Sequence, residues 1–139
     1  MSFKFSVLSY KFLLSLTLCG ILMMSCKPVS PEQRAAEAAL SYYHDLTNDR
    51  VEDFLEGKAG VDKLPADYCD QLLETYRKYL ADIEEKHGGI HEIQISPNVG
   101  RCDSTLQLTY AFLLLCFNDS TQEEVVVPMV EENGNWKMK

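Results

Sequence analysis

The stretch VVVPMVEENGNWKM, residues 125–138, predicts a β-hairpin. Its apolar run ends in two glutamates, and Asn133 and Gly134 follow. This pair favours a two-residue turn, because both positions of such a turn need positive φ. Trp136 then begins another apolar run. We therefore expect a strand over residues 123–130 and a final antiparallel strand after the turn.

Two more strands are predicted upstream of this hairpin. Apolar and polar residues alternate over residues 91–95 and again over residues 105–110. A period of two is typical of a strand. Apolar side chains then continue to Phe117, where the sequence NDST predicts a turn. The C-terminal half of the chain is thus expected to form a four-stranded antiparallel meander.

Three helices are predicted before the strands. Ser30 and Gln33 form a capping box with a proline between them, and apolar residues then recur at helical spacing to about Thr47. A short second helix precedes Gly57, and a longer third helix covers residues 65–87, where two glycines end it. This order predicts an α+β fold, with N-terminal helices packed on a curved four-stranded antiparallel sheet that wraps the long third helix.

Three sequence motifs lie within these predicted elements. They are the pair Tyr42 and Tyr43 followed by LTNDRVEDFL, the strand DSTLQLTYAF, and the terminal hairpin sequence. With them, residues 31–139 resemble the nuclear-transport-factor-2-like superfamily. Within it, the chain is similar to small bacterial lipoproteins built on one such domain of unknown function. The resemblance implies a cone-shaped, cystatin-like domain with a cavity between helix and sheet, used for catalysis, ligand binding or dimer contacts. A fold of this kind does not set the function.

The N-terminus is typical of a secretory signal. Lys4 and Lys11 precede an apolar run over residues 12–24, and Ser25 stands directly before Cys26. As a helix this run would span about 20 Å, short of a hydrocarbon core of roughly 30 Å. The stretch LCGILMMSCK resembles the lipobox of bacterial lipoproteins, which implies cleavage between Ser25 and Cys26 and acylation of Cys26.

These features predict a lipoprotein signal peptide over residues 1–25, a lipidated tether over residues 26–30, and one domain over residues 31–139. The lipid would attach the protein to a membrane of the cell envelope. No acidic cluster follows Cys26, which by resemblance to Gram-negative sorting rules indicates the outer membrane, facing the periplasm. An uncleaved signal anchor is the alternative.

The charge of the chain argues against some partners. Its 139 residues carry 13 Lys and Arg against 21 Asp and Glu, a net charge of −8. Nucleic acids and anionic lipid headgroups are bound through clustered Lys and Arg. We therefore expect no nucleic-acid partner.

No catalytic residue can be placed from the sequence. His44 and Asp45 are neighbours on a helix, so they point about 100° apart and cannot form a simple dyad. His87 and His91 have two glycines between them, which breaks the geometry of a metal site. We expect no metal and no cofactor.

Three tyrosines on predicted inward faces are candidates to line a pocket: Tyr43, Tyr76 and Tyr110. Their hydroxyls would suit a ligand, and core packing is the alternative role. The function expected is a non-catalytic binding or interaction module of the envelope. The alternative is a cone-pocket enzyme of the dehydratase or isomerase type, with a buried acid or base in its cavity.

Three further cysteines follow the lipobox, and an oxidising compartment would allow them to pair. If the third helix and the first strand are antiparallel, Cys102 returns close to Cys69, while Cys116 lies near the opposite edge. A Cys69–Cys102 disulfide is therefore the predicted bridge, and three free thiols are the alternative.

The second predicted strand carries apolar residues on both faces. If the face with Tyr110 meets the helices, the other face presents Leu113, Leu115 and Phe117, and Val126 of the next strand continues it. A contiguous apolar patch marks an interface. We expect a homodimer or an envelope protein partner at this face; the alternative is a bulge or steep coiling that buries these residues within the monomer.

Overall fold

The structure is a computed structural model that describes residues 26–139. The predicted signal peptide over residues 1–25, with Ser25 at its end, lies outside the described residues. Cys26 begins an exposed segment without helix or strand, which leads into the first described helix. Within the described range, no helix combines the length and apolarity that a membrane crossing needs.

The helices follow the predicted order. They are α2 (Pro31–Thr47), α3 (Val51–Glu56), the 3₁₀ turn η2 (Val61–Lys63) and α4 (Ala66–His87). At the start of α2 the Ser30 hydroxyl accepts the backbone N–H of Gln33 at 3.2 Å, so the predicted N-cap is confirmed. Gly88 ends α4 with φ of +71°, a left-handed conformation that suits glycine.

The four strands form an antiparallel meander in the order β1-β2-β3-β4. Their bounds are β1 (Ile90–Asp103), β2 (Leu108–Phe117), β3 (Gln122–Glu132) and β4 (Asn135–Met138). The predicted turn joins β3 to β4, with φ of +51° at Asn133 and +80° at Gly134. The register of β1 on β2 shifts between Ile95 and Gly100, which marks a bulge in β1.

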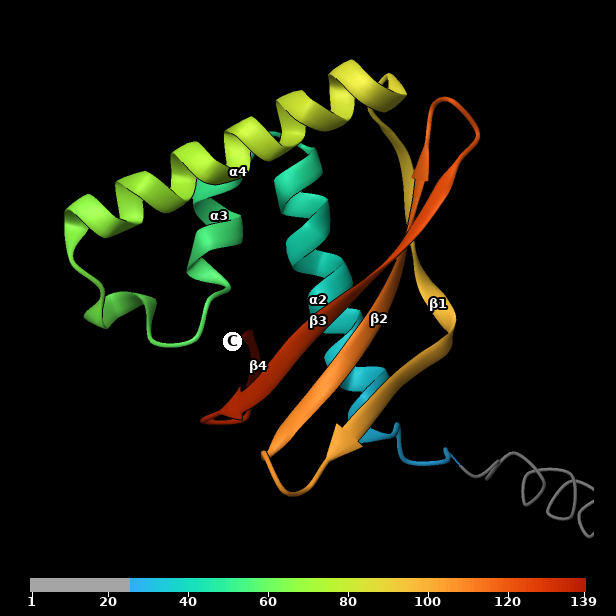
Figure 1. The fold of residues 1–139 in the computed structure, drawn as a ribbon. Helices are drawn as coiled ribbons and strands as arrows, with labels where there is room; N and C mark the ends of the chain where they lie inside the picture. Colours follow the sequence, from blue (N-terminus) through green and yellow to red (C-terminus); the bar gives the residue numbers. More distant parts are fainter. Residues whose placement is uncertain (1–25) are drawn as a thin grey trace, which may run out of the picture.

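The helix wrapped by the sheet is α2, not the long helix α4. Figure 1 shows α2 running behind the strands, and it contacts all four of them. Ala35, Ala36 and Ala39 have no exposed surface, and their small side chains allow α2 to approach the sheet closely. In contrast, Ile83 is the one buried residue of α4, which crosses the end of the sheet. The expectation that the sheet wraps the third helix is wrong.

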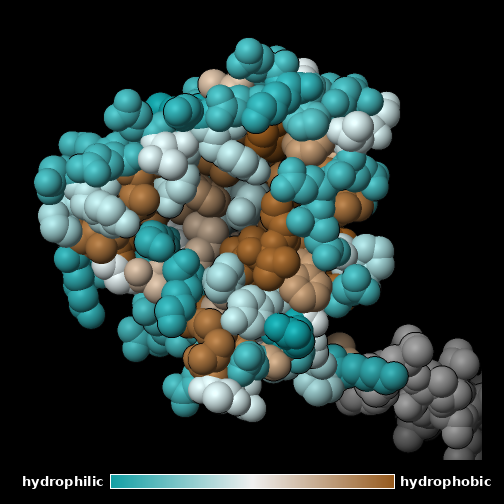
Figure 2. Space-filling model, viewed as in Figure 1, coloured by the Kyte–Doolittle hydropathy of each residue, from teal (hydrophilic) through white to brown (hydrophobic). Residues whose placement is uncertain are grey.

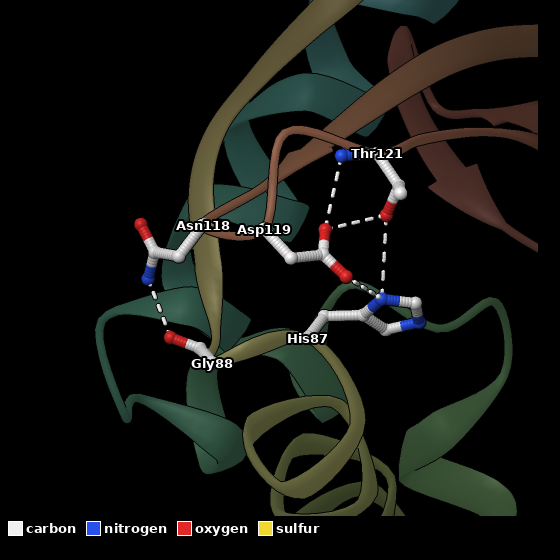
Figure 3. A network of polar contacts seen from close by, with 5 residues as sticks. All are labelled: His87, Gly88, Asn118, Asp119 and Thr121. Carbon is white, nitrogen blue, oxygen red and sulfur yellow. Dashed lines mark hydrogen bonds and ion pairs between the residues drawn. The ribbon is translucent and has the colours of Figure 1, made fainter.

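The turn between β2 and β3 holds the end of α4 in place (Figure 3). Nδ1 of His87 lies 2.8 Å from the Asp119 carboxylate, which also accepts the hydroxyl of Thr121 at 2.6 Å. The side-chain amide of Asn118 donates to the carbonyl of Gly88 at 2.5 Å. His87 thus belongs to a structural clamp. Among residues 26–139, no group of three or more His, Cys, Asp and Glu residues is placed to hold a metal.

The inward face of β2 is the opposite of the one expected. Leu113 and Leu115 have no exposed surface and Phe117 only 5%, because these side chains point into the core against α2. The predicted interface at these three residues is therefore wrong. The structure instead buries them within the monomer, which was the alternative. Val126 faces the other way and is 54% exposed.

Candidate functional site

A groove opens between the helices and the first half of β3. We call it the tyrosine groove; it has a volume of about 560 Å³. Figure 2 shows apolar side chains gathered in the hollow beneath α4. The lining residues come from α2, α3, α4 and β3: Tyr43, Leu46, Phe54, Thr75, Tyr76, Tyr79, and Glu123 to Val126. A second hollow of about 170 Å³ shares Tyr43, Phe54, Tyr76 and Val126 and extends the groove toward the C-terminal end of β4.

The walls of the tyrosine groove are built from three rings on three helices. The ring of Phe54 stands perpendicular to that of Tyr43 at 5.4 Å and to that of Tyr76 at 4.9 Å between centroids. Edge-to-face pairs of this kind stabilise packing beyond the area that they bury. Because Tyr43 and Phe54 also belong to the hydrophobic core or pack against it, these walls are preformed.

The hydroxyl of Tyr43 is held neutral. Burial raises the pKa of Tyr43 to about 12, and the nearby Tyr79, Tyr76 and Glu123 add to this rise. Burial also raises the pKa values of Tyr76 and Tyr79. At neutral pH the groove therefore presents phenol groups that can donate or accept hydrogen bonds, and no phenolate.

The groove has an acidic end and a basic end. Glu123 and Glu124 lie at one end, and Glu124 accepts a 2.5 Å hydrogen bond from the buried Ser96 hydroxyl. Lys58 and Lys139 lie at the other end. Among the described lining residues there is no His, Asp or Cys, so the glutamates are the only carboxylates that could act as a base there.

The structure brings together two of the three tyrosines predicted to line a pocket. Tyr43 and Tyr76 lie in the groove, whereas Tyr110 lies on the outer face of the sheet with the Arg101 guanidinium 5.4 Å from its ring centroid. Sequence reasoning missed Tyr79, which also lines the groove. Its position three residues after Tyr76 puts both on neighbouring positions of one helix face, and this was the available signal.

The predicted Cys69–Cys102 disulfide is not formed, since all four described cysteines are free thiols. Cys69 lies in the first turns of α4 and Cys102 near the end of β1. Figure 1 shows that the start of α4 and the end of β1 lie far apart. The prediction assumed that α4 packs along β1, whereas α4 crosses above the sheet. Cys102 instead lies 3.4 Å from the Thr109 hydroxyl, and its hydrogen bond with Glu32 raises the pKa of the Cys102 thiol.

Comparisons with known proteins identify the fold. Neither a scan against protein-family models nor a search of curated proteins found a match. The 2.00 Å crystal structure of a Campylobacter jejuni protein described as an NTF2-like transpeptidase is similar, with a TM-score of 0.58 and 13% sequence identity. The similarity covers 73% of this chain and 94% of that one. The predicted α+β, NTF2-like fold is therefore confirmed.

Proposed function

We propose that this chain is a lipid-anchored binding module of the cell envelope, whose tyrosine groove holds a ligand without transforming it. The observation that carries this proposal is the lining of the groove, where preformed aromatic walls meet neutral phenol hydroxyls and an exposed apolar rim at Val126. Binding sites for small molecules and peptide segments combine such apolar surfaces with a few placed polar groups.

The position of the groove suits a membrane-anchored protein. Cys26, the proposed site of lipidation, is exposed and lies five residues before the start of α2 at Pro31. Tyr43 lies near the far end of α2, about 18 Å along the helix axis from Pro31. Figure 1 shows the tether leaving the molecule at the end of α2 opposite to α3 and α4. A lipid on Cys26 would thus attach at the end of α2 that is far from Tyr43.

Catalysis in the groove has weaker support than binding. Transpeptidation, the activity in the name given to the Campylobacter protein, is an acyl transfer and needs a nucleophile activated by an adjacent base. In the described lining the one aliphatic hydroxyl is that of Thr75, which donates to the carbonyl of Gln71 at 2.8 Å. An isomerase or dehydratase would have to use a groove tyrosine or one of the two glutamates, Glu123 and Glu124, for proton transfer. The pKa of Tyr43, about 12, is far above neutrality.

Native mass spectrometry of the full chain, purified into lipid nanodiscs from its own membrane, tests the proposal. We expect a retained mass that survives gentle activation and is lost in Tyr76→Ala, because the Tyr76 ring forms one wall of the groove. Tyr110→Ala is the matched control, because Tyr110 lies on the outer face. A retained mass that depends on Tyr110 and not on Tyr76, or the same mass in all three proteins, would refute binding in the groove.

A further inference from the structure

We propose that the tyrosine groove receives an extended segment of a partner protein, which pairs as an added strand with the open half of β3. This rests on the proposed function of the groove and names the class of its ligand. We call residues 123–127 the open edge. Strand addition to a free sheet edge is a recurring way to bind peptides, with backbone hydrogen bonds for affinity and side-chain pockets for specificity.

The open edge lacks a neighbouring strand. β4 pairs with β3 only from Met129 to Glu132, and the last bond of this row joins the N–H of Lys139 to the carbonyl of Pro128 at 2.9 Å. Backbone groups of alternate residues in an antiparallel strand point to the same side. The N–H and C=O groups of Val126 and Glu124 therefore point the same way as the carbonyl of Pro128, beyond the end of β4. Within the described chain no strand pairs with them there.

The tyrosine groove runs along this edge, so an added strand would have a place for its side chains. Val125 and Val126 line the groove together with Tyr43 and Tyr76. Successive side chains of a strand point to opposite faces. Alternate residues of an added strand would therefore rest on the two tyrosines, while those between them would lie beside the exposed Val126.

The other edge of the sheet is less suited to pairing. β1 has a free edge too, but its register shifts between Ile95 and Gly100, and Val99 has φ of +56°. Bulges of this kind protect sheet edges from strand addition. The open edge of β3 has no such bulge, since its register with β2 is continuous from Gln122 to Met129.

The two charged ends of the groove indicate the direction and sequence of the partner segment. Lys139 already occupies the place opposite Pro128. A strand that continues the row of β4 therefore runs antiparallel to β3 and pairs from Val127 to Glu124, which is about 10 Å at about 3.3 Å per residue. The residue before this paired stretch would turn out of the sheet beside Lys58 and Lys139, and the last paired residue would lie near the glutamates. We therefore infer a segment with an acidic residue, alternating apolar residues, and a basic residue four positions later.

Fluorescence anisotropy of the full chain in nanodiscs with a labelled, end-blocked peptide Glu-Val-Thr-Val-Lys tests this inference. We expect saturable binding at peptide concentrations up to about 1 mM. N-methylation of the central threonine should weaken binding by about tenfold or more, because it removes the N–H that would meet the carbonyl of Val126. N-methylation of the second valine is the matched control, since that N–H points away from β3. Exchange of the glutamate and the lysine at the two ends of the peptide should also weaken binding.

Two protein variants at Val126 test the backbone pairing between this residue and the peptide. Val126→Pro removes the N–H that points to the groove and leaves the bonds to β2, and proline is tolerated on edge strands. It should abolish binding, whereas Val126→Ala should retain it; equal unfolding midpoints show that both are folded. No binding, binding insensitive to Val126→Pro, or a concentration-dependent homodimer that blocks the peptide would overturn strand addition. If Tyr76→Ala still abolishes binding while Val126→Pro does not, the groove binds its ligand in another way.

Discussion

Gly57 lies directly against the ring of Tyr42, so that a Cβ at position 57 would stand 2.6 Å from Cδ1 of that ring. The ring cannot easily move, because the Tyr42 hydroxyl donates a 2.8 Å hydrogen bond to the carbonyl of Trp136. This contact joins α2, the end of α3 and β4 at the basic end of the groove. Gly57 is needed for its lack of a side chain and not for its backbone, since its φ is −69°.

Gly57→Ala should therefore lower the free energy of unfolding by about 1–3 kcal/mol, the usual cost of overpacking. Chemical denaturation measures it. In a Tyr42→Ala background the same substitution should cost much less, because the ring that it meets is gone. An equal cost in both backgrounds would contradict the steric explanation.

The fold followed from the sequence where local chemistry decides structure. The N-cap at Ser30, the glycine stop after His87 and the Asn133-Gly134 turn were all predicted, since each depends on a few adjacent residues. The second bond of the predicted capping box is not formed, because the Gln33 side-chain amide donates to Glu37 at 2.8 Å. The packing of α2 instead of α4 in the sheet was not predicted. This packing depends on three alanines that lie close to the strands, and no local sequence pattern reveals that they do so.

The face of β2 was predicted wrongly for a specific reason. The alternation that assigned it came from residues 105–110, but the strand begins at Leu108, after a turn in which Gln107 has φ of +51°. The threonine read as solvent-facing, Thr109, is only 6% exposed. Both faces of β2 are apolar beyond it, so nothing in the strand itself corrected the assignment. The same error placed Tyr110 with the groove tyrosines.

Alkaline pH should destabilise the protein because Tyr43, in the groove, ionises. The pKa of Tyr43 is raised from 10.0 to about 12 by burial, so the folded state disfavours the phenolate. The stabilisation is complete below pH 10 and is lost as the pH rises from about 10 through about 12. The free energy of unfolding should fall over this range, by less in Tyr43→Phe than in the wild type. An identical fall in both would show that Tyr43 does not contribute.

Acid should release the clamp on α4. Hydrogen bonds from the Thr121 hydroxyl, His87 and the Thr121 N–H lower the pKa of Asp119 from 3.8 to about 2. The stabilisation is present above about pH 4 and is lost as the pH falls through about 2. The urea midpoint should drop over this range in the wild type and change little in Asp119→Asn. Thr121→Val should lie between the two; a wild-type response in Asp119→Asn would contradict this account.

Lipidation should depend on Cys26. Cells given an alkyne analogue of palmitate should label the wild type and not Cys26→Ala. Cys19→Ala is the matched control and should label like the wild type, because Cys19 lies within the apolar run and not after Ser25. Equal labelling of the wild type and Cys26→Ala would remove the proposed anchor without affecting the argument for the groove.

Occupancy of the groove is the central claim, and fluorine NMR of the full chain tests it most directly. 3-Fluorotyrosine would replace the six tyrosines that follow Cys26, with signals assigned by single Tyr→Phe variants. Spectra would be compared between protein purified from its own membrane and the same protein refolded free of ligand. We predict shifted signals for Tyr43, Tyr76 and Tyr79 and an unchanged signal for Tyr110. Unchanged groove signals, or a shift at Tyr110 alone, would contradict the claim.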